Sequence, residues 1–324
     1  MKKIIFRADA SSDIGYGHFI RSLALADMLR NNFDCYFATV APSDYQINEI
    51  AKVCKLITLS DKIDHFSCFL SLLNGDEIVV LDNYFFTTEY QKQIKDKGCK
   101  LVCIDDMHDK HYVADVVINH GLNDSKLFNT EQYTKLCLGL NWAMLRKPFL
   151  TKPIIVKIKP IGSIAVCFGG VDKLNLNRKV VELLTKLPHI SKIEIIGGYD
   201  TMPYDNLPAN IILKTYRNVD ADQIVSIFKN NDCAILSAST ICIEALACSI
   251  PVIAGYYVDN QVGLYNYLNN SKYIYGIGNI LEPEALNKKL PEYISVSNFN
   301  LQKDINLDFS SVSENYINLF RGLC

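Results

Sequence analysis

Gly15–Arg21, which reads Gly-Tyr-Gly-His-Phe-Ile-Arg, lies between a short apolar run, Lys3–Arg7, and a segment with helical spacing of apolar residues at 18–31. The run predicts a strand and the later spacing predicts a helix, so the stretch is the turn of a strand-turn-helix unit. Glycines let a ligand approach the backbone, while the free N–H groups and positive dipole end of a helix start attract an anion. The stretch therefore predicts an α/β fold with an anion site beside its first strand.

His18 adds chemistry to this corner. A histidine at a helix start is disfavoured as a cation, so we expect a neutral imidazole that can take a proton from water. This predicts a general base beside a phosphate-bearing substrate.

Two other interpretations of the stretch stay open. Gly15 and Gly17 begin the glycine fingerprint of a dinucleotide-binding fold, but Arg21 stands where the third glycine is needed, and no clear strand-ending acid follows at the usual spacing. Alternatively, His18 only caps the helix and Arg21 is solvated.

Composition limits the class of protein. The 324 residues, 49% hydrophobic and 21% charged, are typical of a globular protein with two domains. A net charge of -2 gives no broad basic field, so we expect neither a nucleic-acid nor a membrane partner. The first apolar run is too short for a signal peptide, and the 11 cysteines lack metal-ligand spacing, which predicts small core residues in a reducing compartment. We expect a cytoplasmic, monomeric protein without a cofactor.

Strand-like and helix-like segments alternate along the chain. In the first half, strands are expected at 2–7, 34–40, 78–82, 100–104 and 115–118, and helices at 18–31, 45–52 and 88–97. After a linker rich in proline and lysine at 147–161, strands are expected at 163–168, 192–196, 211–215, 233–237 and 251–255, and helices at 175–187, 221–230 and 240–248. The pattern predicts two doubly wound, Rossmann-like domains, 1–152 and 160–305, facing across a cleft. A C-terminal helix within 306–324 is expected to pack back on the N-terminal domain.

A second candidate site follows a strand of the C-terminal half. Ser237 and Ser239 end that strand and open a helix, where hydroxyls and free N–H groups suit a pyrophosphate. Glu244, one turn further in, could accept both hydroxyls of a ribose, although a plain helix cap explains the same residues. Other polar or glycine positions expected around this ligand are Gly169, Gly170, Asp172, Asn260 and Gln261.

The run Asp105–His111, with His120 nearby, offers carboxylates and imidazoles that could hold a divalent ion. Lys110 within the run would repel a cation, and adjacent acids are common in solvated loops. We therefore expect no metal site, and expect Asp105 or Asp106 to line the cleft or brace a turn.

Together these turns resemble a known superfamily. The residues that carry the resemblance are Phe6–Ser12 with Ile14, Gly15, Gly17, His18 and Arg21; Asp82–Tyr84; Asp105–Asp106; Asn119; Gly139–Arg146; Gly169–Asp172; Ser237–Ser239; Glu244–Ala245; and Asn260–Gln261. The combination is similar to the GT-B glycosyltransferase superfamily, and most closely to the UDP-sugar hydrolases of pseudaminic acid biosynthesis. Pseudaminic acid is a nonulosonic acid, so the resemblance implies a role in glycan biosynthesis.

The resemblance implies an activity and a set of roles. The reaction would be metal-independent hydrolysis of the anomeric C–O bond of UDP-2,4-diacetamido-2,4,6-trideoxy-β-L-altropyranose, with release of UDP and inversion. His18 would activate water, and Tyr84 would lie near the sugar. The implied substrate-binding residues are Asp9, Gly15, Gly17, Arg21, Asn119, Gly169, Gly170, Asp172, Ser237, Ser239, Glu244, Asn260 and Gln261. Asn83 and Phe85 depart from the histidine and glycine expected around the tyrosine, which affects the shape of the sugar pocket.

Three alternatives to this activity stay open. A glycosyltransferase of the same fold would present an acceptor hydroxyl to His18 in place of water. A hydrolysing UDP-sugar 2-epimerase needs acid and base residues about C2, which the sequence does not identify. A non-catalytic nucleotide-sugar-binding module would bind UDP without turnover.

Overall fold

A computed structural model describes residues 1–11, 15–62, 64–152, 160–170, 172–197, 204, 207–295 and 307–324. The chain divides into two compact units: Met1–Lys147 with Ser311–Cys324, which we call the N-terminal unit, and Pro148–Ser310, the C-terminal unit. Residues 153–159 of the expected linker lie outside the described part, as do 296–306 before the last helix.

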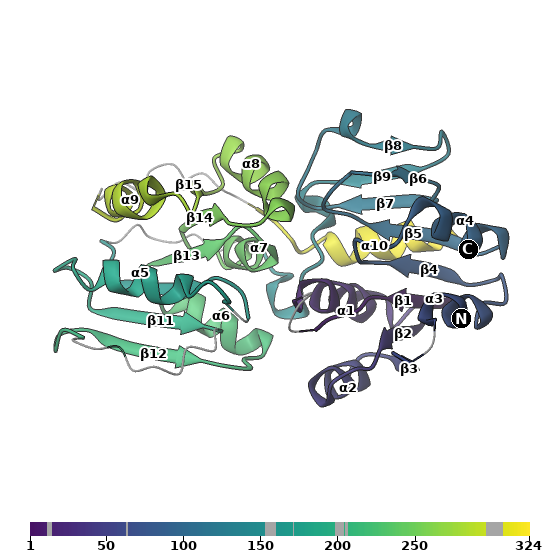
Figure 1. The fold of residues 1–324 in the computed structure, drawn as a ribbon, viewed down its shortest axis with the longest axis horizontal. Coiled ribbons are helices and arrows are strands. Elements are labelled where there is room, and N and C mark those ends of the chain that lie inside the picture. The colour runs from purple at the N-terminus through teal and green to yellow at the C-terminus, as the bar shows by residue number, and fades with distance from the viewer. Residues whose placement is uncertain are drawn as a thin grey trace. The chain divides into compact units, whose positions relative to one another are not determined.

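The N-terminal unit is built on a seven-stranded parallel sheet with the order β3-β2-β1-β4-β5-β7-β9 (Figure 1). The strands are β1 (Lys3–Arg7), β2 (Asp34–Val40), β3 (Lys55–Leu59), β4 (Ile78–Leu81), β5 (Lys100–Ile104), β7 (Val116–Asn119) and β9 (Lys135–Leu138), and a small separate pair is formed by β6 (His111–Tyr112) and β8 (Asn129–Thr130). Ile4, Ile5 and Phe6 are fully buried, because helices cover both faces of a parallel sheet.

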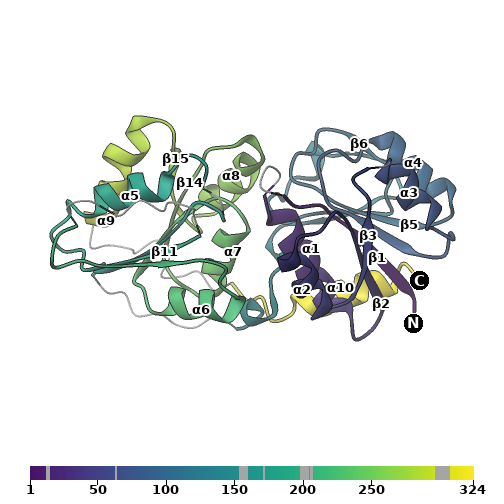
Figure 2. The same ribbon diagram turned by 60° about the horizontal axis from the view of Figure 1, so that its bottom comes forward.

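Helices cover the two faces of this sheet (Figure 2). They are α1 (Gly17–Leu29), α2 (Asp44–Ala51), α3 (His65–Ser71), α4 (Thr88–Asp96) and α10 (Val312–Arg321), with short 3₁₀ turns at Ser125–Leu127, Leu140–Trp142 and Lys147–Phe149. On one face, Phe19 of α1 packs on Phe37 of β2 with 5.4 Å between ring centroids. On the other, Phe69 of α3 and Tyr90 and Ile94 of α4 join one hydrophobic cluster with the sheet. None of the helices in the described ranges is long and apolar enough to cross a membrane.

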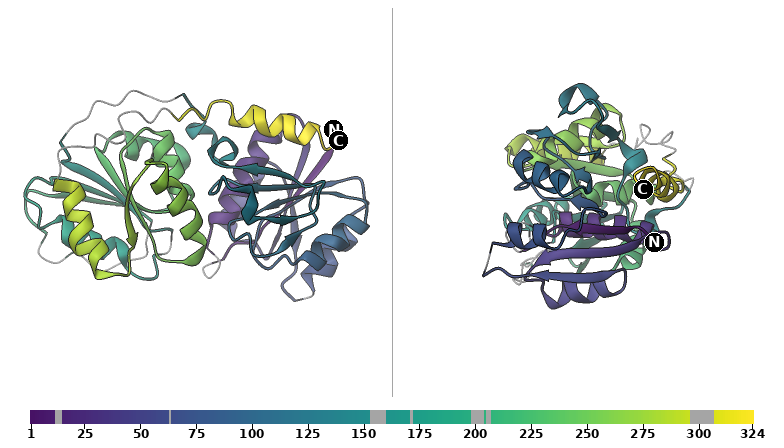
Figure 3. Two further views of the ribbon diagram at one scale, coloured as in Figure 1. Left: turned by 90° about the horizontal axis from the view of Figure 1, so that it is seen from above. Right: turned by 90° about the vertical axis from the view of Figure 1, so that its right-hand side faces the viewer.

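Helix α10 joins the N-terminal unit from the far end of the sequence and contacts α1 (Figure 3). Tyr316 of α10 is fully buried and its hydroxyl donates to the carbonyl oxygen of Trp142 at 2.5 Å. The Tyr316 and Trp142 rings meet edge to face, 5.4 Å between centroids. A buried aromatic with a satisfied hydroxyl anchors the returning helix.

The C-terminal unit repeats the architecture with a six-stranded parallel sheet of order β12-β11-β10-β13-β14-β15. Its strands are β10 (Ser163–Cys167), β11 (Lys192–Ile196), β12 (Ile212–Tyr216), β13 (Cys233–Ser237), β14 (Val252–Tyr256) and β15 (Tyr275–Asn279). Its helices are α5 (Leu176–Leu184), α6 (Ala221–Lys229), α7 (Thr240–Ala247), α8 (Val262–Asn270) and α9 (Leu290–Ser295), with a 3₁₀ turn at Asp259–Gln261 and a π-helical turn at Ala285–Lys289. The two doubly wound sheets expected from the alternation of strands and helices are therefore present.

The cysteines are free thiols. Those expected in the core are buried: Cys99, Cys103, Cys167, Cys233 and Cys242. Burial raises the pKa of the Cys103, Cys233 and Cys242 thiols, which makes them poor nucleophiles and fits a packing role.

Each sheet has one position where the strand order reverses. In the N-terminal unit the chain winds outward from β1 through β2 to β3, then returns to the other side of β1 as β4. In the C-terminal unit β10 and β13 have the same relation. Ligands of doubly wound sheets bind outside the carboxyl ends of the strands at such a switch point. The fold thus offers two ligand positions, one in each unit.

Candidate active site

The polar residues predicted from the first turn gather at the switch point between β1 and β4. β1 ends at Arg7, β4 ends at Leu81, and α1 begins at Gly17. His18 and Arg21 of α1 are each 5% exposed, and Asp82, directly after β4, is 1% exposed. A strand end, a neighbouring strand end and a helix start therefore meet at one buried polar cluster.

His18 is fixed by three contacts. Its Nδ1 lies 2.7 Å from Oδ1 of Asp82 and 3.2 Å from Nη2 of Arg21. Its ring meets the Tyr84 ring edge to face with 4.6 Å between centroids. A carboxylate only accepts hydrogen bonds, and the contact with Asp82 is the shorter of the two at Nδ1, so we place the hydrogen on Nδ1 and the lone pair of the imidazole on Nε2. An Asp–His pair of this kind fixes the tautomer and orientation of a catalytic base.

Arg21 is the centre of the buried charges. Its Nε and Nη2 donate to the two oxygens of Asp82 at 2.8 and 2.6 Å. Its Nη1 donates to both oxygens of Asp106 at 2.7 and 2.8 Å. The hydroxyl of Tyr84 donates to Oδ2 of Asp106 at 2.9 Å. The contacts run from His18 through Asp82, Arg21 and Asp106 to Tyr84, and so return to the His18 ring.

The electrostatics of this cluster favour ionised carboxylates. Burial by itself would raise the pKa of Asp82, but Arg21 and then His18 lower it well below its ordinary value. The pKa of Asp106 is lowered in the same way, because Arg21 outweighs burial. The pKa of Arg21 is raised, since Asp106 and Asp82 together outweigh burial. One guanidinium faces two carboxylates, so these three side chains together carry one uncompensated negative charge.

Of the two glycines in the turn, Gly15 has a backbone conformation that favours glycine. Its φ is +84°, and its backbone N–H donates to the carbonyl oxygen of Ser11 at 2.8 Å. A Cβ added at Gly15 or Gly17 would meet no atom within 4 Å in the described part of the chain. Residues 12–14 of the turn lie outside the described residues.

Asp9 is engaged inside the unit. Its carboxylate accepts from Nη1 and Nη2 of Arg7 at 2.5 and 2.8 Å, and from the backbone N–H of Val40 at 2.8 Å. Its backbone N–H donates to Oδ1 of Asn83 at 2.7 Å, which ties the loop after β1 to the loop after β4. These contacts shape the loop that precedes His18.

Asn119, at the end of β7, is buried and braces a turn. Its Nδ2 donates to Oδ2 of Asp105 at 3.3 Å, and its Oδ1 accepts from the backbone N–H of Gly121 at 2.8 Å. The next residue, His120, is 3% exposed, and its Nδ1 has no hydrogen-bond partner in the described structure. Burial, and then the charge of Arg21, lower the pKa of His120 to about 4.

The acid- and histidine-rich run does not converge on one point. Asp105 accepts from the backbone N–H groups of Met107 and His108 at 3.0 Å, whereas Asp106 binds Arg21. His111 instead contacts Asn129 and Glu131 at 2.8 and 3.0 Å. Among the described residues, no three histidine, cysteine or acidic side chains are arranged to hold a metal ion.

The second candidate site surrounds the switch point between β10 and β13. Gly169, after β10, has φ +92°, and Gly170 follows it. The carboxylate of Asp172 accepts from the backbone N–H groups of Leu176 and Asn177, each at 2.8 Å, and so caps α5. Val171 lies outside the described residues.

The serines lie at the other side of this switch point. Ser237 ends β13 and Ser239 is the N-cap residue of α7, with 3.2 Å between their hydroxyl oxygens. The Ser239 side chain makes no capping hydrogen bond, so it is not the plain cap that the alternative required. Glu244 is 2% exposed, in the second turn of α7.

Gln261 and Asn260 lie in the 3₁₀ turn after β14. Oε1 of Gln261 accepts from the backbone N–H of Tyr257 at 3.1 Å. The Tyr257 hydroxyl in turn donates to the carbonyl oxygen of Phe168 at 3.0 Å, beside Gly169. The turn after β14 is thus joined to the glycine turn after β10.

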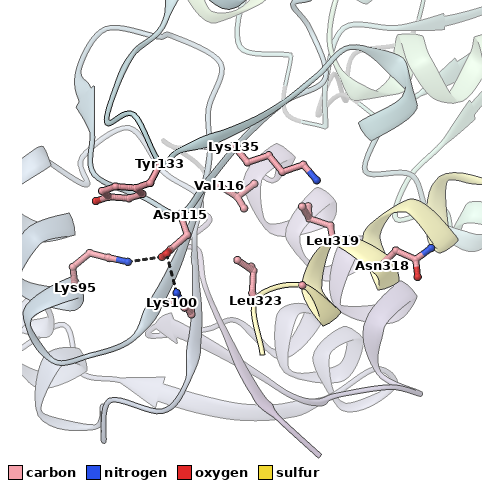
Figure 4. A pocket seen from close by; sticks show the side chains of 10 residues that line it. Lys95, Lys100, Asp115, Val116, Tyr133, Lys135, Asn318, Leu319 and Leu323 are labelled. Carbon is pink, nitrogen blue, oxygen red and sulfur yellow. Dashed lines mark hydrogen bonds and ion pairs between the residues drawn. The ribbon is translucent and has the colours of Figure 1, made fainter.

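A cavity of about 620 Å³ lies at the opposite, amino-terminal end of the first sheet (Figure 4). It is lined by Lys95, Lys100, Asp115, Val116, Tyr133, Lys135, Asn318, Leu319, Gly322 and Leu323. Asp115 pairs with Lys95 at 2.6 Å and with Lys100 at 3.4 Å. Because ligands of such sheets bind at the carboxyl ends, we do not assign this cavity to the reaction.

The sequence-based list of site residues lacked Asp82 and Asp106, although both were among the residues that carry the resemblance. Asp82 touches His18 and Asp106 touches Arg21 and Tyr84. Asp82 directly follows a buried apolar run and Asp106 is the second residue after another, which would have placed both at the carboxyl ends of strands. What the sequence did not contain is the strand order that puts β4 beside β1 and β5 beside β4.

The fold that these two units form is that of the GT-B glycosyltransferases. The chain is similar over 99% of its length to all of MurG from Acinetobacter baumannii, with a TM-score of 0.66 at 12% identity. It is similar over 99% of its length to 96% of the calicheamicin glycosyltransferase CalG4, with a TM-score of 0.60 at 10% identity. HepE from Anabaena, solved with UDP and glucose, gives a TM-score of 0.60 at 11% identity over 99% of both chains.

In sequence, the chain is 26% identical over 283 residues to the UDP-2,4-diacetamido-2,4,6-trideoxy-β-L-altropyranose hydrolase of Campylobacter jejuni, covering 84% of this chain and 97% of that enzyme. It is 28% identical over 282 residues to an uncharacterised protein of Methanocaldococcus jannaschii, covering 82% of this chain and 57% of that longer protein. No family model matches the chain. The protein is therefore related to a UDP-sugar hydrolase and has the fold of a glycosyltransferase.

Proposed function

We propose that this protein is a nucleotide-sugar hydrolase of pseudaminic acid biosynthesis. It cleaves the anomeric C–O bond of UDP-2,4-diacetamido-2,4,6-trideoxy-β-L-altropyranose by attack of water, with release of UDP and inversion at C1. The observation that carries the proposal is the contact between His18 and Asp82, 2.7 Å from Nδ1 to Oδ1 at a switch point of the fold. Its support from comparison is the 26% identity to the Campylobacter hydrolase over nearly all of that enzyme.

His18 acts as the general base. With the Nδ1 hydrogen held by Asp82, the Nε2 lone pair takes a proton from the attacking water as its oxygen bonds to C1 and the C1–O bond to UDP breaks. The imidazolium that forms supplies the positive charge that Arg21, Asp82 and Asp106 leave uncompensated. General-base help of this kind contributes about 10²- to 10⁴-fold in rate.

Tyr84 keeps the base in position. Its ring edge rests on His18 at 4.6 Å, and its hydroxyl is held by Asp106. These contacts limit rotation of the imidazole, so that the orientation of Nε2 is set before the sugar binds. Asp9, Gly15, Gly17 and Asn119 shape the surrounding loops, and we assign them to the sugar side.

The C-terminal unit takes the UDP. The N-terminus of α7, the hydroxyls of Ser237 and Ser239 and the glycine turn at Gly169 and Gly170 offer donors to the diphosphate. Glu244 is the candidate partner of the ribose hydroxyls. We also assign Asp172, Asn260 and Gln261 to this side. Donors at the diphosphate stabilise the leaving group as the anomeric bond breaks.

A glycosyltransferase is the second candidate, favoured by the structures that share this fold. The same base would then act on an acceptor hydroxyl. The two functions differ in the fate of water, because only hydrolysis places an oxygen of the solvent on C1 when no acceptor is present.

The deciding experiment incubates the protein with the UDP-diacetamido sugar in ¹⁸O water and follows the products by NMR and mass spectrometry. Hydrolysis with C–O cleavage places the label on sugar C1 and none on UDP, and NMR shows the inverted anomer with C2 unchanged. Label on phosphate, an epimerised C2 or no turnover contradicts the proposal.

His18→Ala tests the base in the same assay. We expect turnover to fall by about 10²-fold or more while UDP binding is kept, since UDP is assigned to the other unit. His111→Gln is the matched control, because the hydrogen bonds described for the His111 side chain go to Asn129 and Glu131, away from the cluster around His18. A His18→Ala protein with the full rate would show that the assignment of the base is wrong.

A further inference from the structure

His65 opens α3, and its ring contacts Arg7 at the end of β1. Nη2 of Arg7 lies 3.1 Å from Nδ1 of His65. A guanidinium only donates hydrogen bonds, so Nδ1 is the acceptor and the hydrogen of the neutral imidazole is on Nε2. Partial burial, and then the charge of Arg7, lower the pKa of His65 and keep it neutral near pH 7. His65 therefore presents an N–H donor whose tautomer is fixed.

Arg7 is buried, and its charge is paired with a neighbouring carboxylate. It is 1% exposed, forms two hydrogen bonds with the Asp9 carboxylate at 2.5 and 2.8 Å, and lies over the Phe86 ring, 5.5 Å from its centroid. The guanidinium and the carboxylate neutralise each other. The cation next to His65 is therefore already paired, so it adds little attraction for an anionic ligand.

Phe85 provides an apolar surface beside this donor. The residue is 37% exposed, and its ring stands edge to face against His65 at 6.3 Å and against Phe66 at 5.8 Å between centroids. Nζ of Lys110 donates to the carbonyl oxygen of Tyr84 at 2.8 Å, which holds the loop that carries Phe85. A neutral donor and an exposed aromatic ring are thus held together on ordered elements.

This position is linked to the proposed base, His18, by the residue that precedes Phe85 in the sequence. Tyr84, the neighbour of Phe85, has its ring 4.6 Å from that of His18. We propose that His65 and Phe85 form a binding position for an N-acyl group of the sugar, in which Nε2–H of His65 donates to the acyl carbonyl and the Phe85 ring contacts the acyl methyl. The inference rests on the proposed function and names the group that selects the substrate.

The chemistry of the position distinguishes this ligand from others. A hydroxyl would satisfy the donor but leave the Phe85 ring in water, and a phosphate would find the charge of Arg7 already paired with Asp9. An acetamido group offers a carbonyl acceptor and a methyl group a short distance apart, so it uses both features. Pockets select small molecules in this way, with an apolar wall and a few fixed polar groups.

The test compares Phe85→Ala, Phe85→Leu, His65→Ala and His65→Gln with the wild type. For the UDP-diacetamido sugar we expect Phe85→Ala and His65→Ala to raise KM by about 10-fold or more with kcat within about threefold, as for loss of a methyl contact or a hydrogen bond in a pocket. Phe85→Leu, which keeps apolar area, and His65→Gln, which keeps an N–H donor, should restore most of the affinity. The Kd for UDP alone should be unchanged in all four.

Saturation-transfer NMR decides the question without turnover. Irradiation of aromatic protons should transfer saturation to an acetamido methyl of the UDP-diacetamido sugar in the wild type, and much less in Phe85→Ala. If the wild type binds this sugar but does not hydrolyse it, the proposed function is wrong. The NMR result still shows in that case whether Phe85 contacts the acyl methyl. Unchanged KM in both alanine variants, or no transfer to either methyl in the wild type, overturns the inference while hydrolysis stands.

Discussion

Oδ1 of Asp82 lies 2.7 Å from Nδ1 of His18, although 64 positions separate the two residues in the sequence. Asp82 is 1% exposed and also accepts two hydrogen bonds from Arg21. Its carboxylate is therefore anchored by a group that does not take part in proton transfer. An anchored carboxylate holds the imidazole in one tautomer and stabilises its cation once the proton has moved.

Asp82→Asn tests this relationship. The amide keeps the shape of the side chain but removes the charge that stabilises the imidazolium, so we expect kcat to fall by about 10²- to 10⁴-fold with a small change in KM. Steady-state hydrolysis of the UDP-sugar measures both constants. Ser22→Ala is the matched control, because it removes a hydrogen bond to Oδ2 of Asp82 at 2.8 Å and leaves the charge. Equal losses in the two variants would mean that the charge of Asp82 has no special role.

His120 makes the stability of the N-terminal unit depend on pH. Its folded-state pKa is lowered to about 4, from an ordinary value near 6.5. Between these values the unfolded chain binds a proton that the native unit does not, so stability is full above pH 6.5 and falls as the pH drops towards 4. The 2.5-unit difference corresponds to a loss of about 3 kcal/mol.

Urea unfolding between pH 4.5 and 7.5 measures this dependence. Trp142 is the single tryptophan of the chain and belongs to the same unit, so its fluorescence reports the relevant transition. In His120→Gln the loss of stability on acidification should be smaller by up to about 3 kcal/mol, because the groups that face His120, namely Arg21, Asp106 and Asp82, are kept. Parallel curves for the wild type and the variant would contradict the prediction.

Tyr316→Phe should loosen α10. The substitution leaves the carbonyl oxygen of Trp142 without its buried donor, which costs about 1 to 3 kcal/mol. Thermal unfolding followed by circular dichroism measures the effect. Tyr133→Phe is the control, because the Tyr133 hydroxyl also donates to a backbone carbonyl, that of Val113 at 2.9 Å, but the residue is 59% exposed and water can replace the bond. A similar cost in both variants would show that burial is not the cause.

The sequence predicts most where local pattern decides the structure. The segments 34–40, 100–104, 192–196 and 233–237, which are rich in apolar and β-branched residues, are strands with the expected bounds. The glycine turn also points to His18. Its partner Asp82 could not be found in this way, because their contact depends on β4 lying beside β1, which is set by packing of the whole sheet.

β15 shows the opposite case. It reads Tyr-Gly-Ile-Gly-Asn over Tyr275–Asn279, and two glycines in five residues indicate a turn by local rules. The sheet needs them, because β14 and β15 approach closely around a register shift at Ala254 and Gly255, and Gly278 has φ +87°. Tertiary contact thus overrides local propensity, and the strand was not predicted.

Gly255→Ala tests that explanation. An added Cβ would lie 2.7 Å from the carbonyl oxygen of Gly278 and 2.5 Å from Cγ1 of Ile280, so either the backbone of β15 or the core must shift. We expect a cost of about 1 to 3 kcal/mol, as for overpacking of a core. Gly162→Ala is the matched control in the same unit, because its Cβ would meet only ordinary contacts at 3.8 Å or more. Calorimetric unfolding should show a lower Tm for Gly255→Ala alone, and a Gly255→Ala protein as stable as Gly162→Ala would mean that close strand approach is not what requires glycine here.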